Sequence, residues 1–505
     1  MSRQIIKFLI LTFCSYSFSA TFVDPILLNF INSRSTQSTK IVALLKYDQR
    51  GLPAPSRYQA AGVKRYLMSL YKQSAKNVFQ VISRNPQDIR IENQFWINNS
   101  LGLVVTPLGL RKLTELPEIE KIYSNRNINY VKPVAGRLAP TRGDASYPYD
   151  LVDLGIDELM KTNPEIQGQG VSVGVVDTGV DGTHPILAGK VALFYDSVAK
   201  KITPPIDRDK HGTHVSGTIA GGDRASNKIG VAPGAKIIGA AALDGYDNML
   251  ESMQFMLDPD GNPDTQDSPR LVSNSWNAGG APDIELFYRA INAWEAAGIL
   301  PVFSAGNAGP GAGSITTPHE HPSVLAVGAT GKDQKVARFS SRGPAKFQGK
   351  LIEKPDFTAP GVDIVSSIPG GSMASFSGTS MACPHVSGVA ALLYQVNKNF
   401  TPGQIKEIIM KTLRYVDGSG NPIAAPKWDA AYGFGRVNAF AAVKAALSLI
   451  GRNRFQVSVQ SFAPALAPNT ATSYYPTNLM APNFSVSDLT APYPTETRQW
   501  LVVNH

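Results

Sequence analysis

The N-terminal quarter of the chain alternates short apolar runs with helical spacing. Residues 40–48 form an apolar run of strand length, and residues 56–78 place apolar side chains three and four positions apart. Four further elements follow, namely two strands, a short helix and a last strand, at 89–97, 101–106, 108–116 and 119–130. This β-α-β-β-α-β order predicts a small α+β domain of the ferredoxin-like type over residues 38–132.

The larger part of the chain, residues 150–447, alternates runs rich in Val, Ile and Ala with helical segments. Near-continuous apolar runs are typical of strands covered on both faces. Strands are expected at 171–176, 236–242, 271–275, 299–304 and 324–329, and helices at His211–Ala220 and Val386–Val396. The pattern predicts an α/β fold with a parallel, doubly wound sheet and flanking helices, whose site lies at the carboxyl ends of the strands.

Both ends of the chain differ in composition from these two regions. Residues 1–19 carry a positive start, an apolar run over 8–13 and a small-x-small ending at Ser17–Ser19, as a secretory signal peptide does. A membrane anchor needs about 20 apolar residues, and this segment has roughly half that number. A lipoprotein site at Cys14 is disfavoured by the bulky Phe13. We therefore expect a secreted or periplasmic protein.

Two segments lack a regular pattern. Residues 133–149 are rich in Pro, Gly, Ala and Arg and are predicted to be an exposed linker that is cleaved during processing. Residues 448–505 contain six spaced prolines among Ser, Thr and Ala, and are interpreted as an extended C-terminal appendage with no membrane span.

Charge is distributed unevenly along the chain. The net charge is +9, yet residues 21–145 carry 18 Lys and Arg against 8 Asp and Glu, whereas residues 146–505 carry 28 against 31. The basic charge therefore belongs to the N-terminal domain and does not indicate nucleic-acid binding. Opposite charges on the two parts predict that they dock electrostatically.

Three separated motifs carry the chemistry. Asp177-Thr178-Gly179 follows a strand, the segment 211–214 (His-Gly-Thr-His) begins a helix, and Ser380 lies in the segment 378–382 (Gly-Thr-Ser-Met-Ala). A serine hydroxyl needs an imidazole to accept its proton, and the imidazole needs a carboxylate to fix its tautomer. The candidates are Asp177, His211 and Ser380.

Other reactive side chains near the motifs are given structural roles. His214 is one helical turn from His211, so both imidazoles cannot serve one serine equally, and a His211–His214 metal pair lacks a third ligand at recognisable spacing. Cys383 is the one cysteine left after signal removal, which excludes an internal disulfide. A Cys383 nucleophile is disfavoured because the motif centres on the serine.

The order Asp, His, Ser resembles that of the subtilisin-like serine proteases, the subtilase family. The segment 304–309 (Ser-Ala-Gly-Asn-Ala-Gly) is similar to the oxyanion loop of that family, which implies that Asn307 and the Ser380 amide form the oxyanion hole. The resemblance implies substrate-binding roles for stretches near 243–247 and 273–279, and in particular for Ser273, Ser275, Trp276, Asn277, Ala305 and Gly306. Many relatives carry Gly where this chain has Asn277, which leaves the side-chain preference of the primary pocket open.

The helix near 251 and the following acidic loop resemble the bacillopeptidase F branch of the family. Oxygen ligands at Asp258, Asp260, Asn262 and Asp264 suit Ca²⁺, but Gly261 comes two positions early for an EF-hand and the terminal Glu is missing. A solvated acidic loop is favoured, no metal ligand is assigned, and structural Ca²⁺ stays open. No cofactor is expected for the chemistry.

The sequence thus predicts a secreted serine endopeptidase that is made as a zymogen. The resemblance implies that the N-terminal domain is an inhibitory, chaperone-like propeptide, and that the other partners are protein or peptide substrates. The alternatives are a catalytically inactive binding protein with the same fold, an esterase that uses the same triad, and a processing protease of narrow specificity.

Overall fold

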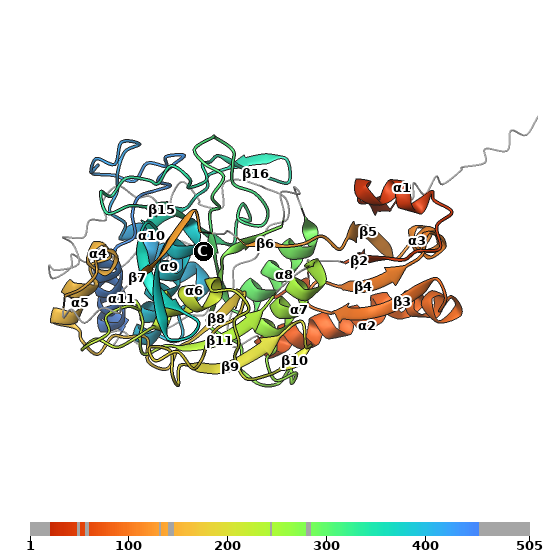
Figure 1. The fold of residues 1–505 in the computed structure, drawn as a ribbon, viewed down its shortest axis with the longest axis horizontal. Helices are drawn as coiled ribbons and strands as arrows, with labels where there is room; N and C mark the ends of the chain where they lie inside the picture. The colour runs from red at the N-terminus through yellow and green to blue at the C-terminus, as the bar shows by residue number, and fades with distance from the viewer. Residues whose placement is uncertain are drawn as a thin grey trace, which may run out of the picture.

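The computed structural model describes residues 21–47, 51–55, 60–130, 133–139, 146–242, 245–278 and 284–453. The expected signal peptide, part of the expected linker and most of the Pro-rich appendage lie outside these residues. Figure 1 shows a small unit of sheet and helices, red to orange, against one side of a larger α/β unit.

The small unit is a ferredoxin-like sheet with one additional strand. Its strand order is β1-β5-β2-β4-β3, in which β1 pairs parallel to β5 and the other neighbours are antiparallel. The strands are Phe22–Val23 (β1), Thr39–Leu45 (β2), Ile89–Phe95 (β3), Ser100–Val105 (β4) and Ile119–Ser124 (β5), and the main helices are Ala60–Arg84 (α2) and Pro107–Thr114 (α3). The expected order of elements is present, with three differences in extent. Helix α2 continues beyond residue 78, and the strand expected over 119–130 ends at Ser124. Strand β1 lies before residue 38, where the domain was expected to begin.

The large unit is built on an eight-stranded sheet of order β10-β9-β11-β8-β12-β14-β15-β18. The strands are Ser172–Asp177 (β8), Val191–Asp196 (β9), Lys201–Ile202 (β10), Lys236–Ala241 (β11), Leu271–Asn274 (β12), Leu300–Ser304 (β14), Leu325–Thr330 (β15) and Phe357–Pro360 (β18). All neighbours are parallel except the β9–β10 hairpin. The predicted doubly wound α/β sheet is confirmed, and the strand order reverses between β8 and β12.

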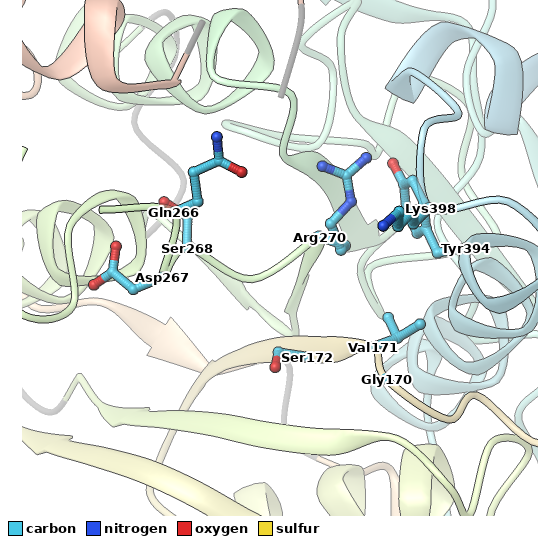
Figure 2. Close-up of a pocket in the computed structure, with 9 residues that line it drawn as sticks. All are labelled: Gly170, Val171, Ser172, Gln266, Asp267, Ser268, Arg270, Tyr394 and Lys398. Atoms are coloured by element: carbon cyan, nitrogen blue, oxygen red, sulfur yellow. The ribbon is translucent and has the colours of Figure 1, made fainter. Parts of the chain in front are cut away.

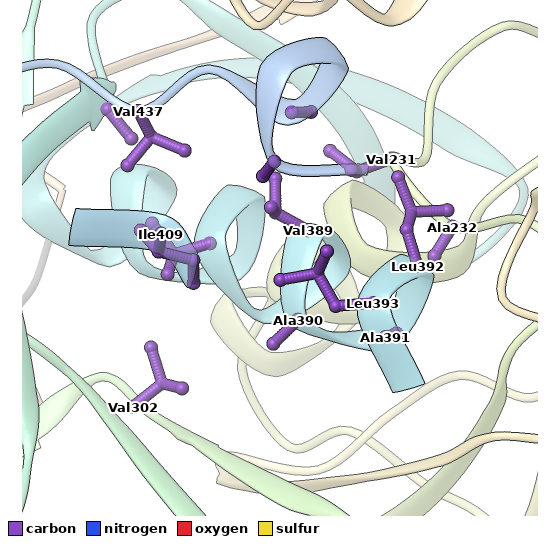
Figure 3. Close-up of a cluster of buried hydrophobic side chains, with 14 of the residues drawn as sticks. Val231, Ala232, Val302, Val389, Ala390, Ala391, Leu392, Leu393, Ile409 and Val437 are labelled. Carbon is purple, nitrogen blue, oxygen red and sulfur yellow. The ribbon is translucent and has the colours of Figure 1, made fainter. Parts of the chain in front are cut away.

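Helices cover both faces of this sheet because its strands are apolar on both sides. Val173 and Val302 face one core with α6 and α9, whereas Val176 and Phe303 face a second core with α7 and α8. Figure 3 shows the first core, in which α9 packs against Val302 from the sheet. The helices are His211–Ala220 (α6), Tyr246–Leu257 (α7), Glu285–Ala296 (α8), Thr379–Val396 (α9), Pro402–Lys411 (α10) and Ala439–Asn453 (α11).

The second core continues into the small unit. Val42, Leu44 and Phe95 are buried in one cluster with Tyr246 of α7 and Phe287 of α8. The open face of the small sheet therefore rests on these two helices, as Figure 1 shows. Burying shared apolar surface is the dominant favourable contribution to such an association.

The chain between the two units pairs with the large one at two places. Asn129–Tyr130 (β6) pairs antiparallel with Trp276–Asn277 (β13), and Ala135–Ala139 (β7) pairs antiparallel with Ser372–Ser377 (β20). Strand β20 also pairs with Ile364–Ile368 (β19), which makes β20 the middle strand of three. Within the expected linker, residues 135–139 thus form a strand, in which residues 136–138 are exposed. Across the described ranges, no helix combines the length and the apolar character that crossing a membrane requires.

Candidate active site

Asp177 and His211 meet at the carboxyl edge of the large sheet. Asp177 is the last residue of β8, and His211 is the first residue of α6. The His211 Nδ1 atom lies 2.7 Å from Asp177 Oδ1, which also accepts the Thr178 amide at 2.7 Å. Both side chains are buried, at 3% and 1% exposure. This bond fixes the imidazole tautomer with its proton on Nδ1, so that Nε2 is the basic nitrogen.

The surroundings of His211 raise the pKa of its imidazole above the ordinary 6.5. Burial by itself disfavours the cation, but the charge of Asp177 and its hydrogen bond outweigh burial, with smaller contributions from Asp207 and Asp209. The site therefore stabilises the imidazolium that forms when His211 accepts a proton.

Close backbone contact holds the two motifs together. A Cβ at Gly212 would lie 2.0 Å from the Gly179 carbonyl oxygen, so only glycine fits there. The Thr178 hydroxyl accepts the Gly212 amide at 2.9 Å and donates to Asp207 at 2.8 Å. Asp207 belongs to neither motif and was not singled out from the sequence, because no local pattern marks it.

Ser380 lies in the first turn of α9 and is fully buried. Helices α6 and α9 pack directly on each other, which brings the second and third motifs to one edge of the sheet. Pro384 has no amide hydrogen to offer the Ser380 carbonyl four residues earlier. The Ser275 hydroxyl donates to this carbonyl instead, at 3.4 Å, and so links the start of α9 to the end of β12.

Asn307 lies beside Ser380, as the oxyanion-loop resemblance implies. Its Oδ1 accepts the Thr379 amide at 3.0 Å and the Thr379 hydroxyl at 2.9 Å. The same hydroxyl accepts the Gly306 amide at 3.2 Å. With Oδ1 held in this way, the Asn307 side-chain amide faces Gly378, where an added Cβ would lie 3.2 Å from Nδ2. Thr379 is thus the residue that positions Asn307, a role not recognised from the sequence.

Two segments carry four of the expected substrate-binding residues. Trp276 and Asn277 offer their main chain to β6, and Ala305 and Gly306 lead into the Asn307 loop. The side chain of Trp276, in contrast, is fully buried against Phe287 and Phe303, and its indole donates to Asn274 at 3.0 Å.

The side chain of Ser273 faces α9. Its hydroxyl lies 3.5 Å from the Cys383 sulfur. Alternate residues of a strand face opposite sides of the sheet, so the expected substrate-binding role of Ser273 concerns its main chain and stays a prediction. Residues 243 and 279, which bound the expected binding stretches, lie outside the described residues.

The remaining histidines and Cys383 have structural contacts. His214 Nε2 lies between the carbonyls of Ile364 and Ala374, at 3.0 and 3.1 Å, and burial lowers the pKa of His214 to about 3. His184 Nε2 lies 2.9 Å from the Ser372 carbonyl. Burial raises the pKa of the Cys383 thiol to about 11, so it stays protonated and is a poor nucleophile.

The acidic loop binds a cation from the small unit. The carboxylate oxygens of Asp258, Asp260 and Asp267 all lie within 4.8 Å of one another. The fully buried ammonium of Lys64, from α2, lies 2.9 Å from Asp258 and 3.0 Å from Asp267, and Asp264 pairs with Arg65. Lys64 thus pairs with two of the three carboxylates. The Ca²⁺ ligand set considered above shares Asp258 and Asp260 with the cluster but lacks Asp267.

A cavity of about 210 Å³ lies away from Asp177 and His211, and Asp267 of the acidic loop is among the residues that line it (Figure 2). It is lined by Gly170–Ser172 and Arg270, where β8 and β12 begin, and by Tyr394 and Lys398. Arg270 donates to the Phe400 carbonyl at 3.0 Å and lies over the Tyr394 ring. The cavity is at the opposite edge of the sheet from Asp177 and is therefore not part of this site.

Comparison with known proteins agrees with the geometry. The model of the subtilase family matches residues 168–435, which is more than half of the chain. The chain belongs to the subtilase family. The matched range contains Asp177, His211, Asn307 and Ser380, and it begins after the small unit and its connecting strands.

Two subtilases from Bacillus subtilis (strain 168) show how far the similarity extends. Bacillopeptidase F is 35% identical over 399 residues, and Serine protease AprX is 32% identical over 402 residues; each match covers 73% of this chain. The first match spans only 27% of Bacillopeptidase F, and the second spans 83% of AprX. A solved structure is also similar, that of fervidolysin from Fervidobacterium pennivorans, a keratinolytic enzyme related to subtilisin. It matches with a TM-score of 0.60 at 23% identity, and the match covers 84% of this chain and 63% of that chain. This similarity supports the fold.

Proposed function

We propose that this subtilase is an exported serine endopeptidase that uses Ser380 as nucleophile, His211 as base and Asp177 to orient the base. The observation that carries the proposal is the hydrogen bond from buried His211 Nδ1 to Asp177 Oδ1, at the edge where α9 presents Ser380. His211 accepts the hydroxyl proton as Ser380 attacks a peptide carbonyl, and then donates it to the leaving amine. Water activated by His211 releases the acyl group.

The negative charge on the substrate oxygen needs donors in the transition state. The Asn307 side-chain amide and the Ser380 main-chain amide are the proposed pair, and the N-terminus of α9 adds its dipole. Because the Thr379 hydroxyl and amide hold Asn307 Oδ1, the amide is fixed before substrate arrives. A group that is already oriented stabilises the transition state without reorganising, which is the basis of such catalysis.

The rate should depend on pH through His211. The imidazole works as a base only when it is neutral, so activity is lost as the pH falls through the pKa of His211. Because that pKa is raised, the acid limb of the kcat/KM profile should be centred above pH 6.5. Asp207→Asn removes a charge that raises the pKa and should move the limb to lower pH. Asp333→Asn, remote from His211, is the control. An acid limb that Asp207→Asn leaves unmoved would contradict this account.

We propose that the small unit is an inhibitory prosegment that the enzyme removes itself. Strand β6 pairs with Trp276–Asn277 on one side of the site, and the Val134 amide donates to Ser377 at 2.7 Å on the other. Tyr130 and Val134 therefore lie on either side of the region of Ser380. We place the cleaved bond in this interval, at or just before the start of the expected 133–149 linker.

Lys64 should determine how firmly the prosegment stays bound after cleavage. Lys64→Met leaves Asp258 buried without its cation, and loss of one partner of a buried ion pair costs about 3 kcal/mol, or roughly 100-fold in affinity. We expect activity to appear correspondingly faster after self-cleavage, measured by the delay between N-terminal cleavage and peptide hydrolysis. Arg65→Met is the matched control, because the Arg65–Asp264 pair is exposed and worth little. Equal delays in both variants would show that the lysine is dispensable.

Export rests on the sequence of residues 1–19, and the expected partners are protein or peptide substrates and the prosegment itself. The alternative of an inactive binding protein predicts that a fluorophosphonate does not label the parent chain. The proposed protease predicts labelling that disappears in Ser380→Ala. A simple esterase would hydrolyse esters but leave the precursor and peptide substrates uncleaved.

A further inference from the structure

The cavity at the amino ends of β8 and β12 is large enough for a small ligand. Its volume of about 210 Å³ corresponds to about seven water molecules at about 30 Å³ each. A phosphate ion or a small polycarboxylate fits in such a space. The reaction proposed above takes place at the other edge of the sheet, so it leaves the cavity without a role.

Two positively charged side chains from separate segments line the cavity. Arg270 precedes β12 and is 7% exposed, and Lys398 lies in the exposed loop after α9. The Arg270 guanidinium donates to the Phe400 carbonyl and lies 4.5 Å from the centre of the Tyr394 ring. These two neutral groups fix the orientation of the guanidinium without cancelling its charge. A guanidinium that is held in this way suits a carboxylate or a phosphate, to which it can donate two parallel hydrogen bonds.

The uncharged polar side chains of the lining can also donate to an anion. Figure 2 shows Arg270 at the centre of the lining, with Gln266 on one side and Tyr394 and Lys398 on the other. Ser172, at the start of β8, lines the floor of the view. Amides and hydroxyls both carry hydrogens that can be donated. The chemistry of the lining therefore suits a ligand with negative charge and several oxygen acceptors.

Asp267 is the one carboxylate in the lining, and its oxygens already accept other donors. One oxygen accepts the Asp260 amide at 2.8 Å, and the other accepts the Lys64 ammonium at 3.0 Å. The charge of Asp267 is therefore compensated from the small unit, and the cavity keeps the positive charge of Arg270 and Lys398. Without Lys64, the carboxylate of Asp267 would repel an anion in the cavity.

The wall at the start of β8 is fixed by the side chain of Gln395. Its Oε1 atom accepts the main-chain amides of Gln167, Gly168 and Gln169, at 2.8, 2.5 and 3.1 Å. These three bonds hold the loop that leads into Gly170, which lines the cavity. A wall that is ordered in advance does not have to be ordered when a ligand binds, which favours affinity.

We propose that this cavity binds a small multivalent oxyanion, a phosphate or a polycarboxylate, and that it does so more tightly while Lys64 of the small unit is docked. By linkage, the bound anion in turn holds the small unit on the large one. If the small unit is the prosegment, as proposed above, the anion delays its release. Binding of the anion itself requires no catalysis.

Isothermal titration calorimetry tests the site on the full-length chain, kept intact by Ser380→Ala, with inorganic phosphate and citrate as probes at constant ionic strength. Lys398→Met should raise the dissociation constant about tenfold, which is the contribution of one hydrogen bond between charged groups. This variant should fold, because Lys398 is exposed. Lys332→Met is the matched control, since Lys332 is an exposed lysine just after β15, at the other edge of the sheet.

The two probes distinguish the sources of the anion. Binding of phosphate alone would identify an inorganic oxyanion, and binding of citrate alone would identify a polycarboxylate. If neither probe binds, or if Lys398→Met binds both as the parent does, the site is excluded. Fluorophosphonate labelling of the parent chain reports on the proposed protease function separately, so the two proposals can fail independently.

The link to the small unit is tested by Lys64→Met. We expect the dissociation constant to rise roughly two- to threefold, the effect of one uncompensated charge at a distance of several Å in a partly solvated site. Asp267→Asn added to Lys64→Met should restore the parent value, because it removes the repelling charge. Arg65→Met is the control, since its pair with Asp264 is exposed. An unchanged dissociation constant in Lys64→Met, or no recovery in the double variant, would overturn the link.

Discussion

Replacing Ser380 by alanine is expected to abolish both self-cleavage and peptide hydrolysis while the fold is kept. Ser380 is fully buried in the first turn of α9, and alanine leaves only a hydroxyl-sized gap. Without a nucleophile no acyl-enzyme forms, and the loss in kcat should reach about 10⁶-fold, the size recorded for removing the serine of subtilisin. The change is therefore the largest that one substitution in this chain should produce.

N-terminal sequencing and fluorophosphonate labelling measure this result. The parent should yield a new N-terminus between residues 131 and 134 and take up the label, and the Ser380→Ala chain should do neither. Ser387→Ala is the matched control, since Ser387 is a buried serine on the same helix whose hydroxyl bonds within the helix to the Cys383 carbonyl at 3.2 Å. Purified Ser380→Ala precursor that still cleaves itself would exclude Ser380 as the nucleophile.

Asp177→Asn is expected to lower kcat by about 10⁴-fold without preventing folding. Asp177 Oδ1 accepts the His211 Nδ1 proton and the Thr178 amide, so the carboxylate fixes the imidazole tautomer and stabilises its cation. An asparagine offers a neutral amide that neither favours the cation nor selects the tautomer. Residual activity should remain, because the serine and the oxyanion donors are still present.

Single-turnover hydrolysis of a peptide substrate measures this loss, together with the rate of precursor cleavage. Slow but complete processing would distinguish Asp177→Asn from Ser380→Ala. Asp181→Asn is the control: Asp181 lies four residues further on and bonds to Thr183 and Gly370, and it does not contact His211. A tenfold loss or less in Asp177→Asn would show that another group orients His211.

Local signals in the sequence were sufficient to single out the three candidate catalytic residues. Asp177 ends an apolar strand, His211 begins a helix with small neighbours, and Ser380 precedes an apolar helix, so each motif has its structural context within a dozen residues. The carboxyl ends of parallel strands share one edge of a sheet, which is why separated motifs could be expected to meet. The ferredoxin-like order of the small unit was likewise readable from periodicity.

Contacts between distant segments were not readable in this way. The β1–β5 pairing joins residues about a hundred positions apart, and Lys64 finds Asp258 across 194 positions. No local sequence pattern identifies these partners, because a sequence alone does not distinguish a buried lysine from an exposed one. The contact of the Ser273 hydroxyl with Cys383 of α9 was unreadable for a related reason, since which face of a strand meets a helix is decided by the register of the whole sheet.

The amino-acid sequence by itself predicted the chemistry that we propose and determined the two folds that carry it, because apolar periodicity and the three motifs are local properties of the chain. Only the tertiary structure decided what those parts contact. It placed residues 135–139 as a strand along β20, Lys64 in the acidic loop, and Thr379 on Asn307. These are matters of register and of packing between remote segments, in which main-chain groups that all residues share form many of the contacts.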